Sequence, residues 1–120
     1  MNTTTTTTSM LDLDTVFEVL SDRRRRYALY ALHRSEGGSM TVDRLAVRVG
    51  RLEDDGRTIT AERRPDRIAE DLREHHVPKL VDAGAVEYDE RSDTARYHGR
   101  PTLEEWLEHA EYREGYHPEC

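Results

Sequence analysis

The chain has almost no cysteine and no long apolar run. Its only cysteine is Cys120, the last residue, so no disulfide can form within the chain, which is typical of a protein of the reducing cytoplasm. Because no stretch of about 18 apolar residues is present, we expect no membrane-spanning helix. Residues 1–11 are polar and threonine-rich without a cationic flank, which predicts a disordered polar tail and not a secretory signal.

Lysine is nearly absent as well, and the charge is strongly acidic. Charged residues make up 36% and apolar residues 35% of the 120 residues, which predicts one domain with a modest core. Lys79 is the only lysine, so 17 of the 18 basic residues are arginine, and 25 acidic residues bring the net charge to −7. This composition resembles that of proteins from salt-loving archaea. At molar salt a Debye length of about 3 Å would screen repulsion from phosphate, so the acidity does not exclude DNA binding.

The most informative stretch spans residues 64–98. Apolar residues at three- and four-residue spacing predict a helix over 64–83, with Gly84 as its stop. Pro78 removes a backbone donor, so we expect a kink near 74–78. The apolar positions are Ile68, Leu72, Val77, Leu80 and Val81.

Two short alternating runs follow this helix. Val86 and Tyr88 alternate with acidic residues, and Ala95 and Tyr97 alternate with basic ones, around a polar turn at 91–93. This pattern predicts a β-hairpin. A helix that leads directly into a hairpin is typical of the end of a winged-helix domain.

Three helices are expected upstream, each with an apolar face at helical spacing. The first spans about 12–20, the second 23–35, and the third begins at Val42, with Gly50 as one possible end. The polar segment 51–60 is then either a loop or an extension of the third helix followed by a loop. The apolar face of the first helix consists of Leu13, Val16, Phe17 and Leu20.

Residues 100–120 predict one more amphipathic helix with an acidic outer side. Thr102 and Glu105 have the spacing of a capping box. The aromatic content of this helix exceeds what a small monomer needs, so we predict a homodimer. The predicted dimer interface is Leu103, Trp106, Leu107, Ala110 and Tyr112. The whole chain is thus predicted to be mostly α-helical with a small β-hairpin: a winged helix-turn-helix domain of three to four helices plus wing over 12–99, and an added C-terminal helix.

Three segments carry a resemblance to known proteins. The chain resembles a family of small haloarchaeal winged-helix proteins of unassigned function over roughly residues 12–98. The segments that carry the resemblance are LSDRRRRYALYALHRSEGG, VDRLAVRVG and REHHVPKLVDAGAVEYDE. The segment 76–84 is more distantly similar to the end of the recognition helix of ArsR-like repressors, which are homodimers that bind operator DNA. The resemblance implies a DNA-binding regulator. The paired cysteines of ArsR-like metal sensors are absent, so it implies no thiolate metal site.

Arginines are the candidate contacts to double-stranded DNA. The helix over 64–83 would enter the major groove, and the wing would reach the minor groove or the backbone. The second helix begins with four arginines at 23–26, where the helix dipole disfavours cations. These either contact DNA or pair with acids of the C-terminal segment. The predicted DNA-binding residues are Arg23, Arg24, Arg63, Arg64, Arg67, Arg73, His75, Arg91 and Arg96.

A protein–protein interaction module without DNA binding is the alternative function. Residues 57–79 hold six basic and five acidic side chains, a mixture that also fits a solvated surface of ion pairs. No nucleophile elbow, phosphate-binding glycine loop or zinc-protease motif is present, so we expect neither an enzyme nor a cofactor. His75 and His76 diverge by about 100° on a helix, so we expect no metal site there and expect His76 to be a satisfied interior histidine.

Overall fold

The computed structural model describes residues 11–54 and 64–115. The first three helices are α1 (Leu13–Leu20), α2 (Arg23–Arg34) and α3 (Val42–Glu53). Each begins at a polar cap whose side chain accepts a hydrogen bond from a backbone N–H three residues on. The caps are Asp12, Asp22 and Thr41. Residues 1–10 of the predicted tail and the segment 55–63 lie outside the described residues, and Leu11, which was assigned to the tail, is half-buried against the core.

The long predicted helix is present but is not uniform. It consists of α4 (Pro65–Asp71), a π-helical turn η4 (Leu72–His76) and α5 (Val77–Asp82). The π turn ends at His76, two residues before Pro78, which lacks the backbone donor that a regular turn needs. The expected irregularity at this proline is therefore confirmed. Gly84 ends the helix with φ of +80°, a conformation that favours glycine.

A three-stranded antiparallel sheet completes the domain. A short 3-10 turn, η2 (Glu36–Gly38), leads into β1 (Ser39–Thr41), and the hairpin is β2 (Val86–Asp89) and β3 (Thr94–Tyr97). The strand order is β1-β3-β2, so Ala95 lies between Met40 and Tyr88. The hairpin is confirmed. β1 was not expected, because three residues are too few to show an alternating pattern.

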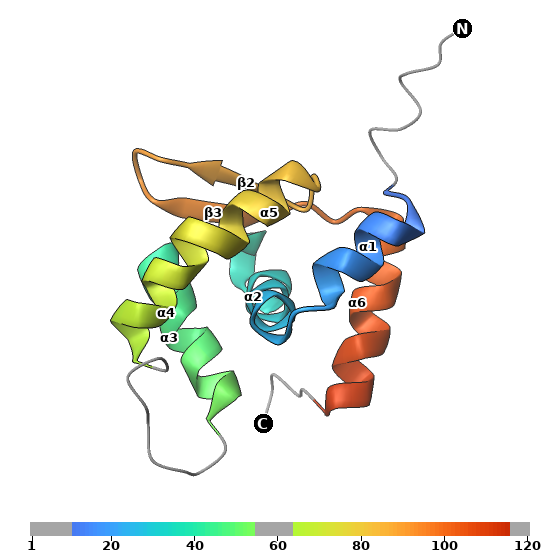
Figure 1. The fold of residues 1–120 in the computed structure, drawn as a ribbon, viewed down its shortest axis with the longest axis horizontal. Helices are drawn as coiled ribbons and strands as arrows, with labels where there is room; N and C mark the ends of the chain where they lie inside the picture. Colours follow the sequence, from blue (N-terminus) through green and yellow to red (C-terminus); the bar gives the residue numbers. More distant parts are fainter. Residues whose placement is uncertain (1–10, 55–63, 116–120) are drawn as a thin grey trace, which may run out of the picture.

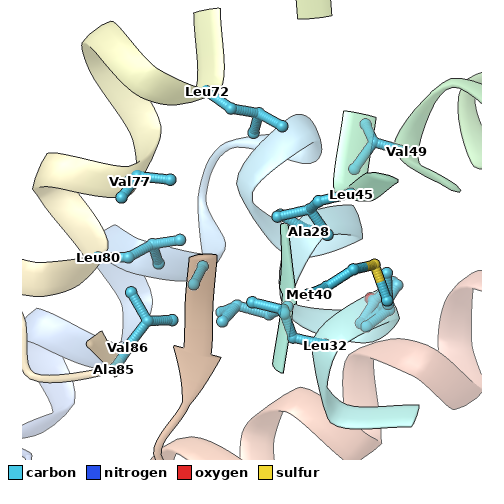
Figure 2. Packing of buried hydrophobic residues seen from close by; sticks show 14 of the residues in the cluster. Ala28, Leu32, Met40, Leu45, Val49, Leu72, Val77, Leu80, Ala85 and Val86 are labelled. Atoms are coloured by element: carbon cyan, nitrogen blue, oxygen red, sulfur yellow. The ribbon is translucent and has the colours of Figure 1, made fainter. Parts of the chain in front are cut away.

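Helix α2 occupies the centre of the molecule (Figure 1). α3 and α4 lie on one side of it, α1 and α6 (Pro101–Glu114) on the other, and the hairpin lies across the top in this view. In Figure 2 the apolar side chains of the η4–α5 segment point toward α2 and α3. Those shown are Leu72, Val77 and Leu80 on one side and Ala28, Leu45 and Val49 on the other. The fold is a winged helix-turn-helix with an added C-terminal helix.

Some local expectations are wrong. The capping box at Thr102 does not form, because α6 begins at Pro101 with Arg100 as a cap that makes no side-chain bond. Of the two alternatives for the residues after Gly50, the structure shows an extension of the third helix, since α3 continues to Glu53. Three apolar side chains assigned to inner faces are exposed instead: Leu13, Phe17 and Val81. None of the helices in the described part of the chain combines the length and apolar content that crossing a bilayer requires.

Candidate nucleic-acid interface

Arg24, a predicted DNA contact, is engaged inside the protein. Its Nε and Nη2 donate to the two oxygens of Glu53 at 2.7 and 2.8 Å, and its Nη1 donates to Asp71 at 3.0 Å. The three residues lie on α2, α3 and α4, so one guanidinium joins three helices. The side chain of Arg24 is only 18% exposed, so we remove it from the DNA-contacting set and assign it a structural role.

Asp71 is shared by two histidines as well. His75 Nδ1 and His76 Nε2 each lie 3.0 Å from one of its oxygens. Burial raises the pKa of Asp71, but the hydrogen bond from Arg24 and the effects of His76 and His75 outweigh it, so the pKa lies below its usual range. His76 is buried as predicted, yet it is not satisfied: its Nδ1 has no hydrogen-bond partner within 11–54 and 64–115.

The other arginines that open α2 also face protein groups. Arg25 is buried and donates to the carbonyl oxygens of α1, Val19 at 3.0 Å among them. Arg26 forms two bonds of 2.9 Å with Glu114 of α6, which confirms for this residue the predicted pairing with C-terminal acids. The hydrogen bonds from Arg26 lower the pKa of the Glu114 carboxyl group, and they outweigh burial, which raises it. Arg23 lies over the ring of Tyr27, 5.2 Å from its centroid.

Arg73 of η4 connects the wing to the helical part of the domain. Its guanidinium bonds the carboxylate of Asp93 in the wing turn, at 2.7 Å from Nη2, and also reaches Asp43 of α3 at 2.8 Å. Asp93 adopts a left-handed φ of 53°. Its carboxylate accepts a hydrogen bond from the Tyr88 hydroxyl, and its carbonyl oxygen accepts one from the Val42 N–H. The hydrogen bond from Arg73 is the main reason that the pKa of Asp93 is lowered. Arg73 therefore positions the wing, whatever else it contacts.

Besides Arg23, Arg73 and His75, four more predicted DNA contacts are exposed. Arg67, Arg91 and Arg96 have no side-chain ion pair among the described residues, and the carboxylate that Arg64 meets, Asp66, is 3.9 Å away. Arg64 and Arg67 lie at the start of α4, Arg91 at the wing turn and Arg96 on β3. Figure 1 places α4 and the tip of the hairpin on the side of the molecule away from α1 and α6. Arg63 lies outside the described residues.

The predicted dimer residues divide into two groups. Leu103 and Leu107 are fully buried in the chain's own core, so assigning them to a subunit interface was wrong. Trp106 and Tyr112 are 37% and 77% exposed, and Ala110 is half-buried. Trp106 stacks edge-on against the exposed Phe17 of α1, with ring centroids 5.4 Å apart. α1 and α6 thus form one exposed apolar surface together.

A family model matches residues 17–96, from α1 to β3, which is two thirds of the chain. The chain belongs to the DUF7344 family, a domain of unknown function. No curated protein and no solved structure shows significant similarity to it. The DUF7344 match includes the arginines discussed above and ends before α6, so the helix that carries Trp106 is an addition to the matched domain.

Within the DUF7344 domain, sequence reasoning missed the carboxylates that organise the arginines. Glu53, Asp71 and Asp93 receive guanidinium groups from residues 29, 47 and 20 positions away in the chain. No local pattern marks them, because each partner is brought close only by the tertiary fold. The only feature of the sequence that indicates a partner for an arginine is opposite charge. Because the chain has 25 acidic residues, that feature does not identify which of them an arginine meets.

Proposed function

We propose that this DUF7344 protein is a DNA-binding transcriptional regulator of the winged-helix type without catalytic activity. The observation that carries the proposal is the exposure of Arg64 and Arg67 in the first turn of α4, the element that a winged helix inserts into the major groove. Side chains near the start of a recognition helix contact base edges or phosphates, and arginine binds both.

The wing supports the same proposal. Arg91 at its turn and Arg96 on β3 are exposed, and Arg73 holds this hairpin against η4 through Asp93. A fixed wing lets two separate arginine pairs contact one duplex at a defined spacing. Preorganised contacts cost less ordering free energy on binding than contacts from a loose hairpin do.

A protein–protein interaction module is the second candidate. It is favoured by the internal ion pairs of Arg24 and Arg73, which leave a smaller cationic surface than the sequence predicts. Glu70 and Glu74 are exposed on the same helical segment as Arg67, where they would repel phosphate. The second candidate predicts that duplex DNA does not bind at any salt concentration.

The two candidates are separated by measuring binding to labelled duplex genomic fragments by fluorescence polarisation. We expect the wild type to bind and Arg67→Glu to weaken binding by about tenfold or more, because one phosphate or base contact is lost and one repulsion is added. Arg113→Glu on α6 is the matched control, with the same charge change on an exposed arginine away from α4. Equal losses in the two variants would indicate non-specific charge effects, and no wild-type binding would favour the second candidate.

We further propose that the active form is a homodimer joined through α1 and α6. Leu13, Phe17 and Trp106 are each more than one third exposed, and the two rings are in contact. A self-complementary apolar surface of this kind suits a two-fold interface, and two-fold symmetry matches operators with paired half-sites. The proposal predicts a dimer mass in sedimentation equilibrium and a monomer for Phe17→Ser/Trp106→Ser. Val47→Ser, an exposed apolar residue of α3, is the control and should remain a dimer.

A further inference from the structure

Three side chains with metal-ligating atoms converge where α6 packs against α2. His33 comes from the last turn of α2, and Glu104 and Glu108 are four residues apart on α6 and therefore share one face of that helix. His33 Nδ1 lies 3.4 Å from a Glu104 oxygen, and His33 Nε2 lies 3.6 Å from a Glu108 oxygen. One ligand atom from each of the three residues lies within 4.8 Å of the other two.

Among the residues that the structure describes, the carboxylates of this cluster have no arginine partner, unlike two other acids of α6. Glu111 is paired with Arg34, and Glu114 is paired with Arg26, each through two hydrogen bonds. Within the described ranges, Glu104 and Glu108 share only the imidazole of His33, which is charged only when it is protonated. The cluster therefore holds two negative charges for at most one positive charge.

Tyr97 adds a polar atom without a partner beside the cluster. Its ring lies against that of His33, with centroids 5.2 Å apart, and its hydroxyl group is buried without a hydrogen-bond partner in the part of the chain that the structure describes. Burial, together with the charges of Glu104 and two neighbouring glutamates, raises the pKa of this phenol. A buried hydroxyl next to carboxylates is placed to donate to a metal-bound water or to a carboxylate that turns toward a metal.

We propose that His33, Glu104 and Glu108 bind one divalent transition-metal ion between α2 and α6. One imidazole nitrogen with two carboxylate oxygens is a ligand set for ions such as Zn²⁺, Mn²⁺ and Co²⁺, whereas Ca²⁺ and Mg²⁺ prefer oxygen alone. Ligand atoms about 2.0–2.2 Å from the ion need to lie closer together than they do now. The Glu108 side chain is 56% exposed and free to move, whereas His33 is held by packing at 13% exposure.

The geometry also specifies what the ion would do. Three protein ligands leave positions for water, and the ion would connect the matched DUF7344 domain, through His33, to the added helix α6. Binding to the folded state alone would raise the thermal midpoint of unfolding. The competing interpretation is an ion triad in which a protonated His33 joins the two glutamates without a metal.

The test is a titration of untagged, metal-free protein with Co²⁺, followed by visible absorption, and competition by Zn²⁺. All proteins would carry His117→Ala/Cys120→Ser, because these two residues are further ligand types in the sequence. We expect one ion per chain for the parent protein and at least about tenfold weaker binding for Glu104→Gln and for Glu108→Gln. Glu105→Gln, an exposed acid of the same helix, is the matched control and should bind within about twofold of the parent.

Two binding results would overturn the proposal. One is the absence of binding to the parent protein up to about 1 mM Co²⁺ or Zn²⁺. The other is binding that Glu104→Gln, Glu108→Gln and Glu105→Gln change by the same amount. Because Glu105 and Glu108 are both exposed, their variants are expected to fold, and circular dichroism would verify this. A thermal midpoint that falls in Glu108→Gln equally with and without metal would identify the ion triad instead.

Discussion

The arginines that begin α2 and those that begin α4 have the same chemistry but different environments. Arg24 and Arg26 each form two hydrogen bonds with one carboxylate, whereas Arg67 has no ion pair among the described residues and the Asp66 carboxylate is 3.9 Å from Arg64. Both sets lie at helix N-termini, where the dipole disfavours cations. The difference shows that an arginine at an unfavourable helix N-terminus is not by that position alone a functional arginine. The carboxylates that the fold brings close decide the role.

The partners of the α2 arginines explain why the cations are tolerated. Glu53 and Glu114 are the last residues of α3 and α6, and an acid at a helix C-terminus is as unfavourable as a base at an N-terminus. When such ends meet, each pair compensates two unfavourable charges through bidentate hydrogen bonds. The structure places Arg24 next to Glu53 and Arg26 next to Glu114. The start of α4 meets no such helix end among the described residues.

The largest expected effect comes from removing the α2 cation with two carboxylate partners. Arg24→Met should lower the free energy of unfolding by about 2–3 kcal/mol, because Glu53 and Asp71 would lose their shared partner in a site that is mostly buried. This expected loss is smaller than that for a fully buried ion pair, because Asp71 is partly exposed. Urea denaturation at neutral pH measures it, and Arg67→Met, which removes a cation of α4, should change the same quantity by less than about 0.5 kcal/mol.

Removing the ion pair between Arg26 of α2 and Glu114 of α6 should have a smaller effect. Arg26→Met and Glu114→Gln should each cost about 1–2 kcal/mol, because the pair is more exposed and the Tyr30 hydroxyl still bonds Glu114 in the arginine variant. The double variant tests the pairing directly. A coupling energy near zero in that double-mutant cycle would show that the two side chains do not stabilise one another.

Local patterns predicted the helices, the Gly84 stop and the hairpin, because each depends on neighbours in the sequence. Asp12 and Asp22 begin helices and Gly84 ends one, each through contacts within four residues in the sequence. The arginine partners were not predictable in the same way, since Arg26 and Glu114 are 88 residues apart. The assignment of Leu103 and Leu107 to a dimer interface was wrong for a related reason. Periodicity shows that the two residues share an apolar face, but it does not show whether a second subunit or the chain's own core covers that face.

The wing provides a pH-dependent comparison. The lowered pKa of Asp93 means that its pair with Arg73 adds stability above the unfolded-state value of 3.8 and loses it as the pH falls through the lower folded-state value. Asp93→Asn should therefore cost about 1 kcal/mol at pH 7, an amount reduced for solvent screening. The difference from wild type should be constant between about pH 5 and 7 and shrink below about pH 4. A difference that grows on acidification would contradict this assignment.

The smallest expected effect on stability is at Arg67, and its sign sharpens the comparison. Arg67→Glu places an acid at the third residue of α4, where the helix dipole favours it by a few tenths of a kcal/mol, and among the described residues it breaks no ion pair. We therefore expect the free energy of unfolding to stay unchanged or to rise slightly, while DNA binding falls. The same substitution at Arg24 would place a third carboxylate beside Glu53 and Asp71 and should prevent stable folding. A loss above about 1 kcal/mol for Arg67→Glu in urea denaturation would mean that this arginine is structural too, and the contrast between the two helices would no longer support a DNA-contacting role.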